Sequence, residues 1–406
     1  TRERILWSLN IDGEKATQTM AKKMEEIKPV KPRRIETGPC KELKFFDDEV
    51  DLSKIPNLIT GEYQTTPYIT AGISFAQDPE TGWTNSAIRR FQVVGRNEIC
   101  CLVIPSQHEG MIFSKYKNMQ KSMPVSIVIG ADPLVYMSCN MPAPDQVDEM
   151  DYWGSFAGEP LETVKSETND IYIPATSEIV LEGEMSFEER RLEGPFPEFT
   201  GFYSGLRKCP VIKIKAVTMR KDPIYQDMAL APPSEGLNIA AFVYALELYR
   251  QLKPLVPAVS DVSILAMLSL VTAVSIKKNV RLKSPGLEKK VAMAVKAVKG
   301  GSLVKNLFLV DDDIDVHSVD DILWAMSTKF QPSKDITVLN DMPGFFLDPS
   351  EMWVGHNGKY SGHTSVGVFN CTEKPAPYDE GYKRGICLPS KEAYEKVGNK
   401  WEKYGL

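Results

Sequence analysis

The chain has 406 residues, and 48 Lys and Arg against 54 Asp and Glu give it a formal net charge of −6. Hydrophobic residues make up 43% of the chain and charged residues 25%, which are ordinary globular proportions and exclude a disordered chain, a collagen-like repeat and a disulfide-stapled miniature. The length predicts two or three domains at roughly 100–200 residues each, and the mildly acidic balance argues against nucleic acid as a partner, since phosphate binding needs an excess of Lys and Arg.

The first half of the chain changes from a helix to strands. An amphipathic helix is predicted at residues 16–27, because the Lys-Pro pairs at 28–29 and 31–32 follow it and proline cannot donate a backbone bond inside a helix. From about residue 69 to 217, β-branched runs alternate with turn sequences, which predicts a largely β domain. The clearest runs lie at 98–104, 125–129, 179–181 and 211–217.

Beyond residue 232 helices and strands alternate, which predicts an α/β region with a parallel sheet. Helical periodicity marks 237–252, 287–298 and 320–328, and 307–310 is a predicted buried strand. The apolar run 262–276 has about 15 residues where about 20 are needed to cross a bilayer, so it is interpreted as a buried strand or core helix and no membrane contact is expected. A last amphipathic helix, at 391–404, is expected to dock on a neighbouring subunit.

The cysteines predict a cytoplasmic location. All seven are scattered and none forms a CxxC pair, which is typical of free thiols in a reducing compartment and gives no support to a zinc or thioredoxin-like site. Residues 1–10 lack the apolar core of a secretory signal.

Two groups of residues are candidates for acid–base chemistry. His108 lies just beyond an apolar run, where functional residues are common; the alternative is a hydrogen-bonded surface imidazole. Glu193 and Glu198 lie in a frame stiffened by Pro195 and Pro197, which can desolvate a carboxyl group and raise its pKa as a general acid requires. The alternative for the glutamates is a solvated surface turn.

Two further motifs have a structural alternative. Asn85 and Arg90 face opposite sides of a regular strand, so they share a site only through a bulge or bend, and otherwise Arg90 is a strand-edge charge. The run DDDID at 311–315 invites a calcium interpretation but lacks the Gly and the distal Glu of an EF-hand loop, so an acidic turn that closes a strand is predicted.

A series of short blocks keeps its order and approximate spacing along nearly the whole chain. The blocks are TGPCKE at 37–42, WTNSAIRR at 83–90, IPSQH at 104–108, MPAPD at 141–145, TNDIYIPA at 168–175, SEIVLEG at 177–183, EGPF at 193–196, DDIDV at 312–316 and LWA at 323–325. Together they resemble the UbiD-type decarboxylases, which include the fungal ferulic-acid decarboxylases.

The resemblance implies prenylated FMN as the cofactor, made by a separate UbiX-like flavin prenyltransferase, with Mn²⁺ or Mg²⁺ and a potassium ion beside its phosphate. It implies Asn85, His108 and Glu149 as metal ligands, an oxygen- and nitrogen-donor set that suits those dications better than a thiolate metal. Further cofactor contacts implied by the family are Ser86, Ala87, Ile88, Arg90, Gln107, Met141 and Lys299.

The family's catalytic Glu-Arg-Glu network falls on Arg90, Glu193 and Glu198. The resemblance implies that Glu198 donates the proton that replaces the departing CO₂, and that Arg90 with Glu193 positions it and the substrate carboxylate. The activity implied is the reversible, non-oxidative decarboxylation of an aromatic or α,β-unsaturated acid, with the flavin as electron sink. Substrate-pocket positions implied by the fungal enzymes are Ile104, Ser234, Phe345 and Leu347.

The fold implied is α+β or α/β in four parts. Residues 1–45 form an N-terminal helix and linker, shorter than the corresponding family segment, and 46–232 form a β-rich, split-barrel-like cofactor-binding domain. An α/β domain follows at 233–385, and a C-terminal helix at 386–406 is expected to contact another subunit of a homodimer or homohexamer.

Other functions remain open beside this one. The nearer alternative is the catalytic subunit of a multi-component, phenylphosphate-type carboxylase, and the further one is a redox flavoprotein with plain FMN. A glycosidase with Glu193 and Glu198 as its acid pair leaves the other blocks unexplained. The segment APPSE at 231–235 replaces a Gly-Arg stretch of several relatives, and GFFLDPS at 344–350 differs from the fungal enzymes in its second half. Lys329 stands where the fungal enzymes have an Arg near the potassium site, so the resemblance does not define the substrate.

Overall fold

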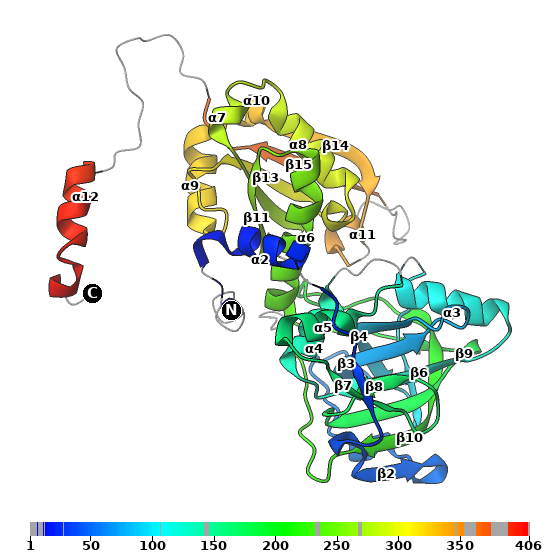
Figure 1. Ribbon diagram of the computed structural model, residues 1–406. Coiled ribbons are helices and arrows are strands. Elements are labelled where there is room, and N and C mark those ends of the chain that lie inside the picture. The colour runs from blue at the N-terminus through cyan, green and yellow to red at the C-terminus, as the bar shows by residue number, and fades with distance from the viewer. Residues whose placement is uncertain are drawn as a thin grey trace.

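The structure, a computed structural model, describes residues 6, 11, 13–26, 28–105, 107–141, 146–231, 236–266, 270–345, 347–352, 363–374 and 389–404. A β-rich domain and a C-terminal α/β domain lie one beneath the other (Figure 1). The fold is therefore the mixed α and β architecture that the sequence predicts.

The β-rich domain is a closed barrel of antiparallel strands in the order β10-β5-β4-β3-β6-β9, with β9 pairing back to β10. The bounds are β3 Tyr68–Gln77, β4 Thr84–Val93, β5 Glu98–Cys100, β6 Met123–Ile129, β9 Ile179–Glu193 and β10 Arg207–Met219. A short strand, β2 (Leu43–Phe46), extends the sheet beyond β10. Closure of the barrel by the β9–β10 pairing brings strands that are distant in sequence, such as β4 and β9, close together in space.

Two apolar clusters fill this domain. One takes buried side chains from all six barrel strands, among them Ile69, Phe91 and Leu181, and is joined by Ile112 and Phe113 of α3 (His108–Asn118). The other lies across the opposite face of β3 and β6. It is covered by α4 (Pro133–Asn140), α5 (Glu149–Ala157) and a small sheet of β1 (Arg33–Ile35), β7 (Glu162–Lys165) and β8 (Tyr172–Pro174).

The C-terminal domain is a five-stranded mixed sheet in the order β11-β12-β13-β15-β14. The parallel sheet predicted there is present in β12, β13 and β15, and the two edge strands run antiparallel to them. The bounds are β11 Val259–Ala266, β12 Val271–Ile276, β13 Asn306–Asp311, β14 Ile336–Pro343 and β15 His363–Asn370. Helices α6 (Gly236–Leu255) and α8 (Leu287–Ala297) pack on one face, and α9 (Val319–Lys329) packs on the other.

The described residues among the first 45 are divided between the two domains. Helix α2 (Ala16–Glu26), which the sequence predicts, buries Ala16, Met20 and Met24 in the same core as α6. In contrast, β1 and β2 pair with strands of the β-rich domain. Tyr152 and Phe156 of α5 also pack against the core around α6, so the two domains share an apolar contact.

Two predicted elements differ from the structure. The apolar run 262–276 is neither one strand nor a helix but parts of β11 and β12, which pair antiparallel around the intervening residues. The final helix is interrupted: α12 (Lys391–Gly398) ends near Gly398, a poor helix former, and a separate 3₁₀ turn follows at Trp401–Tyr404. Helix α12 has no buried residue and lies apart from both domains in Figure 1.

The predicted free thiols are present. Cys40, Cys100, Cys101, Cys139, Cys209 and Cys371, the cysteines within the described ranges, are all free thiols. No helix in the described part of the chain combines the length and the apolar character needed to span a membrane.

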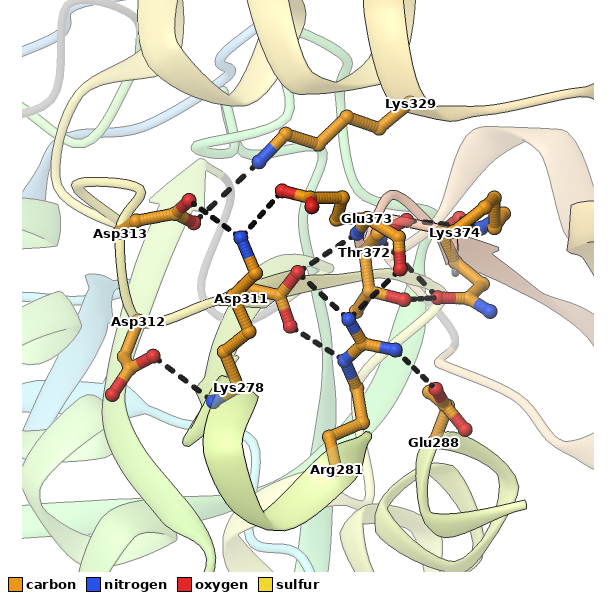
Figure 2. A network of polar contacts seen from close by, with 11 residues as sticks. Lys278, Arg281, Glu288, Asp311, Asp312, Asp313, Lys329, Thr372, Glu373 and Lys374 are labelled. Atoms are coloured by element: carbon orange, nitrogen blue, oxygen red, sulfur yellow. Dashed lines mark hydrogen bonds and ion pairs between the residues drawn. The ribbon is translucent and has the colours of Figure 1, made fainter. Parts of the chain in front are cut away.

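A network of ion pairs closes one end of the C-terminal sheet (Figure 2). Arg281, at the end of α7 (Lys278–Arg281), donates from Nε to Asp311 Oδ1 at 2.5 Å and from Nη2 to Oδ2 at 3.0 Å. The Arg281 side chain is 5% exposed and that of Asp311 0%. Asp313 pairs with Lys278 and Lys329, each at 3.5 Å. The predicted acidic turn that closes a strand is confirmed, since β13 ends at Asp311 and cations of the chain pair with Asp311 and Asp313.

Replacing Arg281 with Met should destabilise the protein by about 3–5 kcal/mol, because the mutation leaves the buried Asp311 carboxylate without its cation. Urea unfolding followed by circular dichroism measures the loss. As a control, Lys278→Met removes a part-exposed member of the same network and should cost less than about 1 kcal/mol. Equal losses in the two variants would contradict this account.

Candidate active site

Arg90 joins two buried glutamates into one network. Its Nε donates to Glu193 Oε1 at 2.9 Å and its Nη2 to Glu193 Oε2 at 3.4 Å, while Nη1 donates to Glu198 Oε1. Glu193 is fully buried and Glu198 is 5% exposed. The three residues predicted to carry catalysis are thus in direct contact.

Strand irregularity and a tight loop bring these residues together. The pairing of β3 with β4 shifts register around Arg90, because Thr70 and Ala71 both lie between the pairs Ile69–Phe91 and Gly72–Arg89. Strand β9 ends at Glu193, and the loop that follows is held by hydrogen bonds from Glu198 N to Phe202 O and from Ser204 N to Phe196 O. The rigid loop is present, but the extra residue of the bulge belongs to β3 and not to β4, so it does not bring Asn85 and Arg90 onto one face of β4.

Other side chains complete the network and were not predicted individually. Tyr68 donates from its hydroxyl to Glu193 Oε1 at 3.2 Å and accepts from Gly194 N at 3.0 Å. Gln92 Oε1 also accepts from Gly194 N, at 3.1 Å. The Phe196 ring lies 4.6 Å from the Arg90 guanidinium carbon. Tyr68 and Gln92 lie in strands that look like ordinary core sequence, so no local signal identifies them.

The environment of Glu198 favours a carboxyl group that keeps its proton. Burial raises the pKa of Glu198 above its ordinary value, the Arg90 cation lowers it, and Glu193 raises it again, with a net upward shift. For Arg90, burial alone would lower the pKa, but Glu198 and Glu193 raise it well above normal. The network therefore contains a permanent cation beside a carboxyl group tuned toward proton donation.

A second polar cluster surrounds Glu149, the first residue of α5. Its Oε1 accepts from Asn85 Nδ2 at 2.8 Å, and its Oε2 accepts from Ser86 N at 2.9 Å and from Ser86 Oγ at 3.2 Å. Burial raises the pKa of Glu149 to about 7 and that of neighbouring Asp148 to about 6. Among the residues whose contacts are described, the donors to this carboxylate are all neutral, so a bound cation would offset the cost of burying it.

His108 is connected to this cluster through Trp83. The His108 and Trp83 rings meet edge to face with centroids 5.1 Å apart. Trp83 Nε1 donates at 3.0 Å to Val147 O, two residues before Glu149. The described chain contains no group of three His, Cys, Asp or Glu side chains that could hold a metal ion. The set implied by the resemblance also includes the amide of Asn85, whose Nδ2 donates to Glu149.

The remaining residues implied for cofactor and substrate lie on several elements. Ala87 and Ile88 continue β4, Gln107 precedes α3, Met141 follows α4, and Lys299 begins a 3₁₀ turn of the C-terminal domain. Among the pocket positions, Phe345 stacks on Phe199 with ring centroids 6.0 Å apart, directly beside Glu198. Ile104 and Leu347 are half-buried, and Ser234 lies outside the described residues.

Lys329 lies at the opposite end of the C-terminal sheet from Phe345, so it gives no support to a potassium site beside that residue. It pairs with Asp313, which lies just beyond the carboxyl end of β13. Phe345 instead follows β14, whose end pairs with the start of β15. Because β13 and β15 are parallel, the two positions lie at opposite ends of the sheet.

Comparisons with known proteins give a consistent result. The chain matches a family model for the 3-octaprenyl-4-hydroxybenzoate carboxy-lyase Rift-related domain at residues 32–233, and one for the C-terminal domain of that carboxy-lyase at 237–362. The pyrrole-2-carboxylic acid decarboxylase of Pseudomonas aeruginosa is 30% identical over 414 aligned positions, which cover 97% of this chain and 81% of that protein.

Solved structures agree with these matches. The apo 3,4-dihydroxybenzoic acid decarboxylase (AroY) of Klebsiella pneumoniae superposes with a TM-score of 0.86 at 26% identity, covering 98% of this chain and 84% of that one. The UbiD-class enzyme HmfF of Pelotomaculum thermopropionicum, in complex with FMN, gives a TM-score of 0.84 at 27% identity, covering 97% and 85%. An evolved dimeric form of HmfF has been solved with prFMN.

Proposed function

Because this chain belongs to the UbiD family of carboxy-lyases, we propose that it is a reversible decarboxylase of an aromatic or α,β-unsaturated acid that uses prenylated FMN. One observation carries the proposal: Arg90 joins Glu193 and Glu198 in a buried network within a chain that matches aromatic-acid decarboxylases along its length. A redox flavoprotein has no need of such a network.

Glu198 is the proposed proton donor. When bound, prenylated FMN supplies the electron sink for the electron pair that remains on the substrate when CO₂ leaves. The Glu198 carboxyl then transfers its proton to the carbon that carried the CO₂, and becomes a carboxylate. Arg90 stabilises that carboxylate through Nη1 and can bind the carboxylate of an incoming substrate. In the carboxylation direction Glu198 takes the proton back.

Glu193 and Tyr68 have a positioning role in this proposal. Glu193 accepts two hydrogen bonds from Arg90 and one from Tyr68, which restricts the guanidinium to one orientation. The orientation matters because Nη1, the remaining nitrogen of the guanidinium, donates to Glu198. Proton transfer depends on such placement, since a small misalignment of reacting groups slows a reaction strongly.

The cluster around Glu149 is the proposed metal and phosphate site. Asn85, His108 and Glu149 would hold Mn²⁺ or Mg²⁺, and the buried carboxylate with neutral donors supports a cation there. Further cofactor contacts are proposed for Ser86, Ala87, Ile88, Gln107, Met141 and Lys299.

The pocket proposed for the substrate lies where the two domains meet. Phe199, next to Glu198, stacks on Phe345 of the C-terminal domain. Flat apolar surfaces beside an acid–base group favour an aromatic or conjugated acid over a flexible polar one. Ile104 and Leu347 are the other described positions proposed to line this pocket.

Assembly and supply are also proposals. Helix α12 carries exposed apolar side chains at Tyr394, Val397 and, beyond its end, Trp401, which supports a contact with another copy in a homodimer or homohexamer. Prenylated FMN requires a flavin prenyltransferase as supplier, and the free thiols support a reducing, cytoplasmic location.

Glu198→Gln should keep the flavin and lose decarboxylation, because an amide of similar shape cannot donate the proton. CO₂ release from a panel of phenolic, heteroaromatic and acrylic acids, by protein matured with a flavin prenyltransferase, measures the effect, and the flavin spectrum checks cofactor binding. An active Glu198→Gln enzyme would remove Glu198 as donor. Wild-type activity that appears only with partner chains would favour a multi-component carboxylase. Bleaching of the flavin spectrum by a nicotinamide donor would favour a redox flavoprotein.

Glu193→Gln should move the alkaline limb of kcat/KM to lower pH. Decarboxylation requires protonated Glu198, so the rate falls as the pH rises through the pKa of that group. Since Glu193 raises this pKa and Arg90 lowers it, removing the Glu193 charge makes Glu198 ionise at lower pH. The pH profile measures the shift, with Glu188→Gln, an exposed change on the same strand, as control. A shift to higher pH would contradict the assignment.

The affinity of the flavin-free protein for Mn²⁺ should rise as the pH increases through about 7, because burial raises the pKa of Glu149 to about 7 and the metal binds the carboxylate form. Calorimetric titration with Mn²⁺ at a series of pH values around 7 measures this change in affinity. Glu149→Gln should weaken binding and reduce this pH dependence, because one of the ligands that must lose a proton is removed, whereas Asp151→Asn on the same helix should do neither. Unchanged binding by Glu149→Gln would exclude Glu149 as a ligand.

A further inference from the structure

We propose that Arg89 and Glu109 are positioning residues that hold His108 where it can bind the metal ion. The inference rests on the function proposed above, because it takes His108 as a ligand, but it concerns residues to which that function gives no role. Neither side chain belongs to the Arg90 network or to the Glu149 cluster.

Arg89 faces away from the acid–base network although it is adjacent to Arg90. Consecutive side chains on a strand point to opposite faces of the sheet. Arg90 therefore meets Glu193 and Glu198 on one side of β4, and Arg89 reaches the first turn of α3 on the other. Ser74, on the adjacent strand β3, reaches the same turn.

One guanidinium binds the residues on both sides of His108. Arg89 Nε donates to Glu109 Oε2 at 2.6 Å, and Arg89 Nη1 donates to Gln107 Oε1 at 2.9 Å. The second carboxylate oxygen of Glu109 accepts from Ser74 Oγ at 2.7 Å. The Glu109 side chain is 1% exposed and that of Arg89 11%. His108 is the residue between the two that Arg89 holds, so its backbone is restrained on each side.

The Arg89 contact adds to the backbone contacts that position the start of α3. Gln107, the residue that precedes the helix, makes no side-chain capping hydrogen bond to it. The backbone there is also close-packed: a Cβ on Gly110 would lie 2.1 Å from Ile104 O, so the first turn sits directly on the preceding loop. A planar guanidinium with several donors fixes such a turn more firmly than a single hydrogen bond can.

The orientation of a metal ligand depends on the neighbouring side chains that hold it. Side chains that orient metal ligands from behind typically change metal affinity by about 10- to 100-fold when they are removed. The chain offers a matched control on the same helix. Lys115, two turns further on, pairs with Asp78 at 2.7 Å, so its loss also untethers α3 but at the end remote from His108.

The test uses the full chain reconstituted with FMN and Mn²⁺. Arg89→Met and Glu109→Gln should weaken Mn²⁺ binding about 10- to 100-fold, and should reduce the nitrogen coupling of His108 in the pulsed EPR spectrum of bound Mn²⁺. Lys115→Met should lower the melting temperature but leave the affinity and the coupling unchanged. Arg89→Lys can pair with Glu109 without spanning to Gln107, so it should fold like wild type and still bind Mn²⁺ less tightly.

The outcomes separate this inference from the proposed function. If wild type shows Mn²⁺ with a histidine nitrogen, and Arg89→Lys and Glu109→Gln match it in affinity and coupling, the positioning role is wrong while the metal site stands. If Lys115→Met loses as much affinity as Arg89→Met, the pair acts only through the stability of α3 and the inference fails. If wild type binds no Mn²⁺, the proposed metal site and this inference fall together.

Discussion

The site depends on a cation placed between two buried carboxyl groups. Two glutamates that lie close together repel each other when both are charged, and burial disfavours each charged form. Arg90 relieves both effects, because one guanidinium donates to Glu193 with two of its nitrogens and to Glu198 with the third. The Tyr68 hydroxyl donates to Glu193, and the Phe196 ring packs against the Arg90 guanidinium. Without that cation, neither the burial of Glu193 nor the placement of Glu198 is stable.

Strand β4 organises both halves of the site. One of its faces presents Arg90 to the glutamates, and its other face presents Arg89 to the start of α3. Nearer its beginning, Asn85 and Ser86 bind the carboxylate of Glu149 at the start of α5. The acid–base network and the proposed metal site are therefore built on one strand, and a displacement of β4 would disturb them together. A rigid barrel strand suits this task better than a loop.

One end of the C-terminal sheet contributes Phe345 to the proposed substrate pocket, and ion pairs stabilise the other end. Phe345 follows β14 and meets Phe199 beside Glu198. At the opposite end, Arg281 and Asp311 form the buried pair that ties α7 to β13 (Figure 2). The acidic run that begins with Asp311 has a structural role here, since Lys278 and Lys329 both pair with its third member, Asp313. The proposed substrate pocket and the stabilising ion pairs thus lie at opposite ends of the same sheet.

The sequence by itself determined the family, through ordered blocks, and helices α2, α6, α8, α9 and α12, because amphipathic period and proline breaks are local properties. It also identified the Glu193–Glu198 frame as rigid and apolar. Only the tertiary structure decided that Tyr68 and Gln92 join this frame, that Arg89 pairs with Glu109, and that α2 packs with α6. Arg90 and Glu193 are 103 positions apart in the chain, and barrel closure brings them into contact. Such contacts depend on which strands become neighbours, and local periodicity in the sequence does not specify strand pairing.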